Sequence, residues 1–183
     1  MKQTVAGMIL FTLLAVPPIR ELFESAMITH MLVQLPLLIV SGWLMGSSVI
    51  NRYHNFFQKW NADGVAGMLL VVTITMYWML PRVLDESLVI WYIELFKFTG
   101  LSFLTGISLR DSWKKLGVIG KSFIFLNYLS MFALMAWVYI DIPVQICNNY
   151  LEVEQKMLGW GFLAITLAMV LYIIQQVFTD HSA

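Results

Sequence analysis

The chain has 183 residues, of which 60% are hydrophobic and only 12% are charged, and its formal net charge at pH 7 is zero. Soluble domains carry about twice that charged fraction, so this composition predicts a polytopic integral membrane protein rather than a soluble one. The zero net charge gives no basis for nucleic-acid binding, and the single cysteine, Cys147, excludes a disulfide within the chain. We expect one transmembrane domain over residues 1–183.

Six apolar segments predict an all-α bundle of six transmembrane helices, because a helix crosses a bilayer with about 20 apolar residues. The first segment ends at Pro17-Pro18 without the small-residue cleavage site of a signal peptide, which predicts a short first membrane helix. The connections are short and polar, as in bundles of neighbouring helices. The predicted spans are roughly residues 4–18, 26–50, 64–82, 87–109, 117–140 and 158–178.

The second segment contains the residue that most strongly suggests a functional site, His30. An ionisable side chain within the membrane is costly and is a functional-site candidate. Met27, His30, Met31 and Gln34 follow helical spacing and share one stripe, and thioether with imidazole is a ligand set suited to copper. We therefore predict His30, Met31 and Met27 as Cu(I) ligands, with a further donor from another helix. The alternative is a histidine that hydrogen-bonds a neighbouring helix among ordinary core methionines.

The fourth segment contains a second polar site, formed by Glu94 and Lys97. These residues are three positions apart, so they share a helix face and can pair. A lone charge at mid-membrane costs about 2.5–3.5 kcal/mol on insertion scales. One interpretation is a structural ion pair that locks helix packing. The other is that Glu94, with Glu24, supports a metal or proton site at His30.

Two connections on the same predicted side resemble each other: PIRELFES from Pro18 and PRVLDES from Pro81. They indicate a tandem repeat of outward-facing hairpins, with residues 117–178 as a diverged third copy containing YIDIP from Tyr139. Such a repeat would place Glu24 and Glu86 at equivalent depths. The alternative is that helix starts favour Glu and Ser for capping and dipole reasons, which needs no common ancestor.

Lysine and arginine predict the orientation, because cytoplasmic loops are enriched in both. We expect both termini in the cytoplasm, N-in and C-in, in the inner membrane of a bacterium, with the basic and aromatic loop 51–60 lying on the inner membrane surface. The only lysine and arginine residues in the predicted outer loops are Arg20, Arg82 and Lys156. The predicted inner loops contain Lys2, Arg52, Lys59, Arg110, Lys114, Lys115 and Lys121.

Motifs of several enzyme classes are missing from the sequence. It contains no HExxH, GxSxG, Walker or GxGxxG pattern, so we do not expect an enzyme with its own turnover. A bis-histidine haem needs two axial histidines within the bundle, and only His30 lies in a predicted span, so no haem is expected.

Two segments resemble CtaG-type cytochrome c oxidase assembly factors over roughly residues 16–110. The run THMLVQLPLL from Thr29 is similar to the family's His-Met-x-x-His membrane motif, and YWMLPRVLDES from Tyr77 is similar to its Trp-x-His-x-Pro segment. The chain departs from the family where Gln34 replaces the second histidine of the first motif and where Met79 replaces the histidine before the proline. Family members also usually have about seven spans rather than six.

The resemblance implies delivery of copper to an oxidase. We therefore predict a copper-related assembly or accessory membrane protein for a membrane oxidase or monooxygenase. The alternative is a non-catalytic structural transmembrane subunit of a multi-subunit respiratory or oxidising complex. Both hypotheses imply lipid and other integral membrane subunits as partners.

Overall fold

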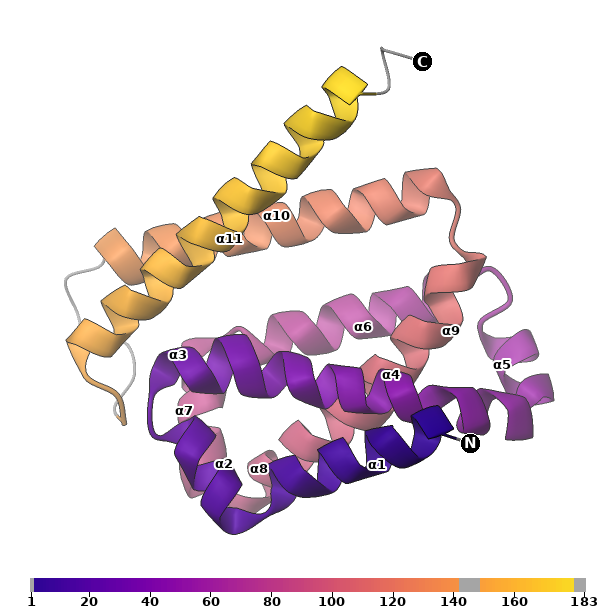
Figure 1. Cartoon of the computed structure of the whole chain (residues 1–183), viewed down its shortest axis with the longest axis horizontal. Helices are drawn as coiled ribbons and strands as arrows, with labels where there is room; N and C mark the ends of the chain where they lie inside the picture. The colour runs from indigo at the N-terminus through magenta and orange to yellow at the C-terminus, as the bar shows by residue number, and fades with distance from the viewer. Residues whose placement is uncertain (1, 142–148, 180–183) are drawn as a thin grey trace.

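A computed structural model describes residues 2–141 and 149–179, and every element of secondary structure in these ranges is a helix (Figure 1). The all-α prediction is therefore confirmed for the described residues. In chain order the elements are α1 (Lys2–Ala15), α2 (Pro17–Glu24), α3 (Met27–Thr29), η1 (His30–Gln34), α4 (Leu35–Arg52), α5 (His54–Trp60), α6 (Val65–Trp78), α7 (Pro81–Val89), α8 (Trp91–Thr99), η2 (Gly100–Gly106), α9 (Ile107–Lys115), α10 (Val118–Asp141) and α11 (Glu152–Thr179), where η marks a π-helix.

The first two-thirds of the chain form two units of the same design. In each, a long helix (α1 or α6) is followed by a short helix that begins at a proline and bends away by 71° at α2 and 74° at α7. Pro17 and Pro81 end the preceding helices, because a residue before proline is pushed into extended conformation, as Val16 and Leu80 are. A second long helix then runs back without a break, as α3–η1–α4 or α8–η2–α9.

The returning helices of the two units pack against each other at a pair of glycines. A Cβ atom on Gly42 of α4 would overlap the backbone of Ser102, and one on Gly106 would overlap the backbone of Ile39 and Gly42. Small residues allow helix backbones to approach this closely in membranes. Gly42 and Gly106 are 64 positions apart, as are Pro17 and Pro81. Equivalent glycines therefore meet where the two units touch.

The hairpin of α10 and α11 packs on these units mainly through the first half of α11. Phe162 stacks on Phe132 and Tyr139 of α10, with ring centroids 5.6 and 6.1 Å apart. Tyr128 of α10 bonds Thr75 of α6 through their hydroxyls at 2.7 Å. Beyond Thr166 no described residue of α11 is buried, and this half extends away from the bundle (Figure 1).

The length and hydropathy of the helices identify an integral membrane protein. Three helices are long and apolar enough to cross a membrane, namely Met27–Arg52, Val118–Asp141 and Glu152–Thr179, and the number rises to five if each bent pair is one span. The predicted span 87–109 is not among them. It is divided by a break at Ile90 and carries two charges, so the count of six stays a prediction.

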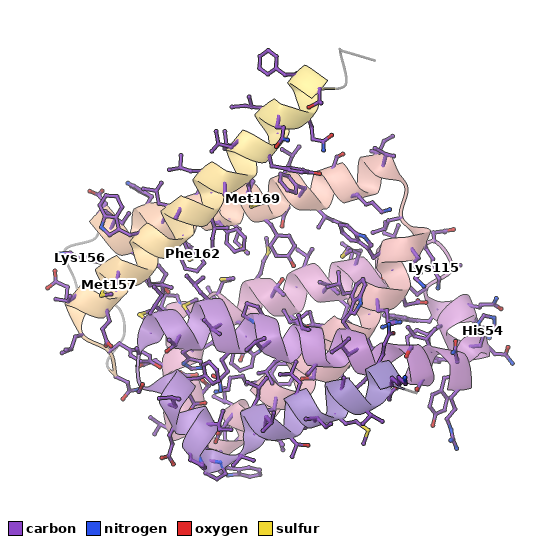
Figure 2. The ribbon with its side chains drawn as sticks, in the orientation of Figure 1. His54, Lys115, Lys156, Met157, Phe162 and Met169 are labelled. Carbon is purple, nitrogen blue, oxygen red and sulfur yellow. The ribbon has the colours of Figure 1, made fainter. Side chains whose placement is uncertain are left out.

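The two predicted sets of loops lie at opposite ends of the molecule. His54 and Lys115 lie at one end in Figure 2, and Lys156 lies at the other. The predicted surface loop forms the short helix α5, where Phe56 and Trp60 stack with ring centroids 6.2 Å apart and are both exposed. Residues 142–148, with Pro143 of the predicted third copy and Cys147, lie outside the described residues.

Candidate functional site

His30 begins the first π-helical segment, directly after the bend between α2 and α3. The segment is closed by the Leu35 N–H, which donates to the His30 carbonyl five residues earlier. Pro36 follows it, and proline has no N–H for the carbonyl four residues before it. π-Helical turns often occur at functional sites. This turn directs His30 and Gln34 inward, and both side chains are completely buried.

Both ring nitrogens of His30 are hydrogen-bonded. Nδ1 lies 2.8 Å from the hydroxyl of Tyr150, and that hydroxyl donates to the backbone carbonyl of Glu24 at 2.9 Å. Because the phenolic proton goes to Glu24, the phenol oxygen accepts from an Nδ1–H group, which assigns the tautomer. The other nitrogen, Nε2, is the acceptor for the Lys97 ammonium at 3.3 Å.

Lys97 connects the two units through its fully buried ammonium group. Its Nζ donates to Glu24 Oε1 at 2.5 Å, and Gln34 Nε2 donates to the same oxygen at 3.4 Å. Glu24 ends α2 and Lys97 lies on α8, so this ion pair joins the bend of the first unit to the returning helix of the second. Removing one member of a buried ion pair leaves the other charge buried without a partner, which strongly destabilises the fold. Loss of either Glu24 or Lys97 should therefore destabilise this protein.

Glu94 does not pair with Lys97 as predicted. It forms its ion pair with Arg20 of α2, at 2.6 Å, and Arg20 also lies 3.9 Å from Glu24. The sequence prediction considered only the three-residue spacing on one helix. The bend at Pro17 brings α2 against α8, so each charge of α8 finds an opposite charge on α2. The two cations and two carboxylates balance, and the Arg20–Glu94 pair keeps side chains that are 30% and 25% exposed.

Met27 and Met31 are both buried in the hydrophobic core, on either side of His30 in the chain. The Met31 sulfur accepts a hydrogen bond from the Tyr139 hydroxyl at 3.9 Å. Within residues 2–141 and 149–179, no three His, Cys, Asp or Glu side chains are grouped to hold a metal ion. Those residue types do not include thioethers, so the Cu(I) site of His30, Met31 and Met27 stays a prediction.

Sequence reasoning missed the contribution of the segment before α11. Asn149 donates from its backbone N–H and its side-chain amide to Asp85 Oδ1, at 3.0 and 2.8 Å, while the adjacent Tyr150 bonds His30 and Glu24. Two consecutive residues therefore attach the third hairpin to both bent helices, α7 and α2. The only signal in the sequence was that the imidazole of a buried histidine needs partners, which does not say which residue supplies them.

No family model, curated protein or solved structure matches this chain. The likeness to CtaG-type assembly factors therefore rests on the two segments described above.

Proposed function

We propose that this protein is a non-catalytic accessory subunit of a membrane-bound oxidase or monooxygenase complex. The observation that carries the proposal is the polar cluster of Arg20, Glu24, His30, Glu94 and Lys97, in which both nitrogens of His30 have protein partners and the two cations balance the two carboxylates. Such a cluster fixes the relative positions of three hairpins and leaves the apolar outer faces of the bundle for other membrane subunits. The resemblance of residues 16–110 to oxidase assembly factors supports the choice of complex.

Copper delivery is the second candidate, and buried Met27 and Met31 next to His30 favour it. A Cu(I) ion at this position needs an unprotonated imidazole nitrogen. In the structure that nitrogen accepts from Lys97, whose ammonium would also repel the metal. Copper binding would therefore require Lys97 to turn fully toward Glu24, and for this reason we favour the accessory-subunit function.

The copper content of the purified protein distinguishes the two functions. After incubation with Cu(I) under reducing conditions and desalting, we expect less than stoichiometric copper, with equal values for the parent chain, His30→Ala and His54→Ala. His54 is the matched control because it is an exposed histidine on α5. One bound copper ion that is lost in His30→Ala and retained in His54→Ala would contradict our proposal and establish the copper function.

Association with a complex is the direct test of the subunit function. When the protein is tagged and extracted in a mild detergent, we expect stoichiometric co-purification with subunits that carry the oxidase or monooxygenase cofactors, identified by their spectra and masses. A protein recovered from native membranes without such subunits would contradict the proposal, whatever its copper content.

We further propose that both termini face the cytoplasm and that the membrane is the bacterial inner membrane. The loop charges support this orientation. In a Cys147→Ser background, a cysteine at Gln58 should be protected from an impermeant thiol reagent in intact cells, and one at Glu152 should be labelled. Both positions are exposed, unlike Asn61, which is buried against Asp111. The reverse pattern would invert the orientation.

A further inference from the structure

The cations at the two ends of the molecule differ in how they are paired. At the bent end every cation of the described chain has a carboxylate partner: Arg20, Arg82, Lys97 and Lys156. At the opposite end, Lys115 is the one described cation in an ion pair, with Asp111. The described cations there that form no ion pair are Lys2, Arg52, Lys59, Arg110, Lys114 and Lys121. This end therefore presents positive charge that the chain itself does not neutralise.

Part of this charge surrounds a hollow of about 260 Å³ between the last turns of α4 and α9. Ser47 and Asn51 of α4 line one side, and Arg110, Lys114 and Lys115 of α9 line the other. Hydroxyl, amide, guanidinium and ammonium groups are all hydrogen-bond donors. The hollow thus combines donors with positive charge, which suits an oxyanion.

The guanidinium of Arg110 is held in place at this hollow. Nη1 donates to the Trp43 carbonyl at 2.7 Å and Nη2 donates to Gln3 Oε1 at 3.1 Å, so two of its five N–H groups are used by these bonds. Cations in the last turn of a helix also stabilise its dipole, which accounts for Lys114 and Lys115. That effect is confined to the last turn, and Arg110 lies five residues before the end of α9, so its guanidinium is held at the hollow by the bonds to Trp43 and Gln3 and not by the dipole.

Asp111, the one acid that lines the hollow, does not cancel this charge. Its Oδ2 accepts from Lys115 at 2.8 Å and from Asn61 at 2.7 Å, and the residue is buried. The Asp111–Lys115 pair is therefore neutral. Arg110 and Lys114 remain as two charges without a carboxylate partner among the described residues.

The position of the hollow along α4 points to lipid as the source of the anion. The continuous helix Met27–Arg52 has 26 residues, which gives it a length of about 39 Å at 1.5 Å per residue. The hydrocarbon core is about 30 Å thick, so the last turns of this helix reach the headgroup layer. Exposed Trp113 and Trp60, near the same end, are typical of a membrane interface. Basic pockets between membrane helices bind anionic headgroups in this layer.

We propose that the hollow between α4 and α9 binds the phosphate headgroup of an anionic phospholipid. Arg110 and Lys114 contact the phosphate oxygens, Ser47 and Asn51 contact the remaining headgroup oxygens, and the acyl chains enter the surrounding bilayer. This lipid site is independent of the oxidase function proposed above and of which side of the membrane the end faces.

The test compares dioctanoyl phosphatidylglycerol, dioctanoyl phosphatidylcholine and inorganic phosphate as ligands of the purified full chain, with affinities from native mass spectrometry. We expect phosphatidylglycerol to bind more tightly than the other two. Each cation near an anionic lipid contributes about a fivefold change in affinity, so Arg110→Gln with Lys114→Gln should weaken binding about 25-fold. Arg82→Gln with Lys156→Gln is the matched control, because it removes two cations from the opposite end and should change the affinity less than twofold.

The variant Lys114→Gln alone keeps the test valid if the Arg110 variant misfolds. Arg110 bonds Trp43 and Gln3, so its loss can disturb the fold, whereas Lys114 is exposed. It should weaken phosphatidylglycerol binding about fivefold without changing the melting temperature. Equal affinity for phosphatidylcholine, or equal losses in the two double variants, would overturn the site. Binding of inorganic phosphate as tight as that of phosphatidylglycerol would assign the hollow to a soluble anion and overturn the lipid proposal.

Discussion

The two units, residues 2–52 and 65–115, share their architecture but not their chemistry. Their bends differ by only 3°, both begin the short helix at proline, and their glycines meet at equivalent positions. Yet the position of His30 in the first unit is held by Glu94 in the second, 64 residues later, and Lys97 corresponds to Val33. The two units therefore share a backbone plan and differ in their charged residues.

The difference shows how a bundle of two similar units acquires a unique polar interior. The first unit supplies Arg20, Glu24 and His30, and the second supplies Glu94 and Lys97. Neither unit has this set of ion pairs by itself, because the fully buried Lys97 of the second unit pairs with a carboxylate of the first. Two identical units would have placed like residues opposite each other at the bend.

The largest effect should come from removing the contact between the units. Lys97→Met leaves Glu24 with Gln34 and Arg20 at the longer distances of 3.4 and 3.9 Å, and we expect a loss of about 3–5 kcal/mol in unfolding free energy. Thermal unfolding in detergent, followed by circular dichroism, measures the change. Adding Glu24→Gln should recover part of the loss.

The exposed pair Lys156–Glu152 provides the control for this comparison. Lys156→Met should cost less than about 1 kcal/mol, because solvent screens an exposed pair. If the double variant of Lys97 and Glu24 were no more stable than Lys97→Met alone, the two residues would not be energetically coupled. The claim that their ion pair stabilises the contact between the units would then be wrong.

A smaller loss of stability is expected from substitutions at the glycines where the two units touch. Gly42→Ala forces a methyl group against the backbone of Ser102, which cannot move aside as a flexible side chain can, so we expect a loss of up to about 3 kcal/mol. Gly106→Ala should have a similar effect, and the double variant should lose less than the sum because both changes widen one contact.

Gly117 is the matched control for these glycines, because a Cβ atom there meets nothing within 4 Å. Gly117→Ala should leave the melting temperature unchanged. If the Gly42→Ala and Gly117→Ala proteins had the same melting temperature, the close approach of the two units would not be required for stability.

The smallest of the three losses of stability should come from removing the contact between the α10–α11 hairpin and the two units. Tyr150→Phe removes the hydroxyl that bonds His30 Nδ1 and the Glu24 carbonyl, and each lost hydrogen bond should cost about 1 kcal/mol. Tyr172→Phe, at an exposed tyrosine bonded to Gln176, is the control and should have no effect on unfolding. A stable Tyr150→Phe variant would limit the polar cluster to the first two units.

The helical architecture was predictable from the sequence because it depends on local signals. Apolar segments located the long helices, and Pro17-Pro18 marked the end of the first one to within a few residues. The bend at Pro81 was not predicted, because the expected span 64–82 runs through it. The resemblance between the two proline connections predicted a repeat that makes Glu24 equivalent to Glu86. The structure relates the two units by 64 residues, so Glu24 corresponds to Leu88 instead. The break at Ile90 was missed because nothing in the surrounding apolar residues marks it.

The candidate site was predictable only in part, because its contacts join distant segments. The burial of His30 and Lys97 followed from their positions within apolar segments. Their partners did not: the Lys97–Glu24 pair spans 73 residues and the His30–Tyr150 bond spans 120. The predicted Glu94–Lys97 pair was wrong because helical spacing shows which residues can meet on one helix, and not which charges a bend brings across from another.

The attachment of α11 through Asn149 and Tyr150 has a consequence for the order of biosynthesis. Both residues leave the ribosome after the first two units are complete, and chains generally fold from the N-terminal end as they emerge. Until Tyr150 arrives, the Nδ1–H of His30 and the carbonyl of Glu24 lack the hydroxyl that satisfies them. A nascent chain that stops before α11 therefore leaves the Nδ1–H of His30 and the carbonyl of Glu24 without this partner, so the first two units complete their polar contacts only after residue 150 is made.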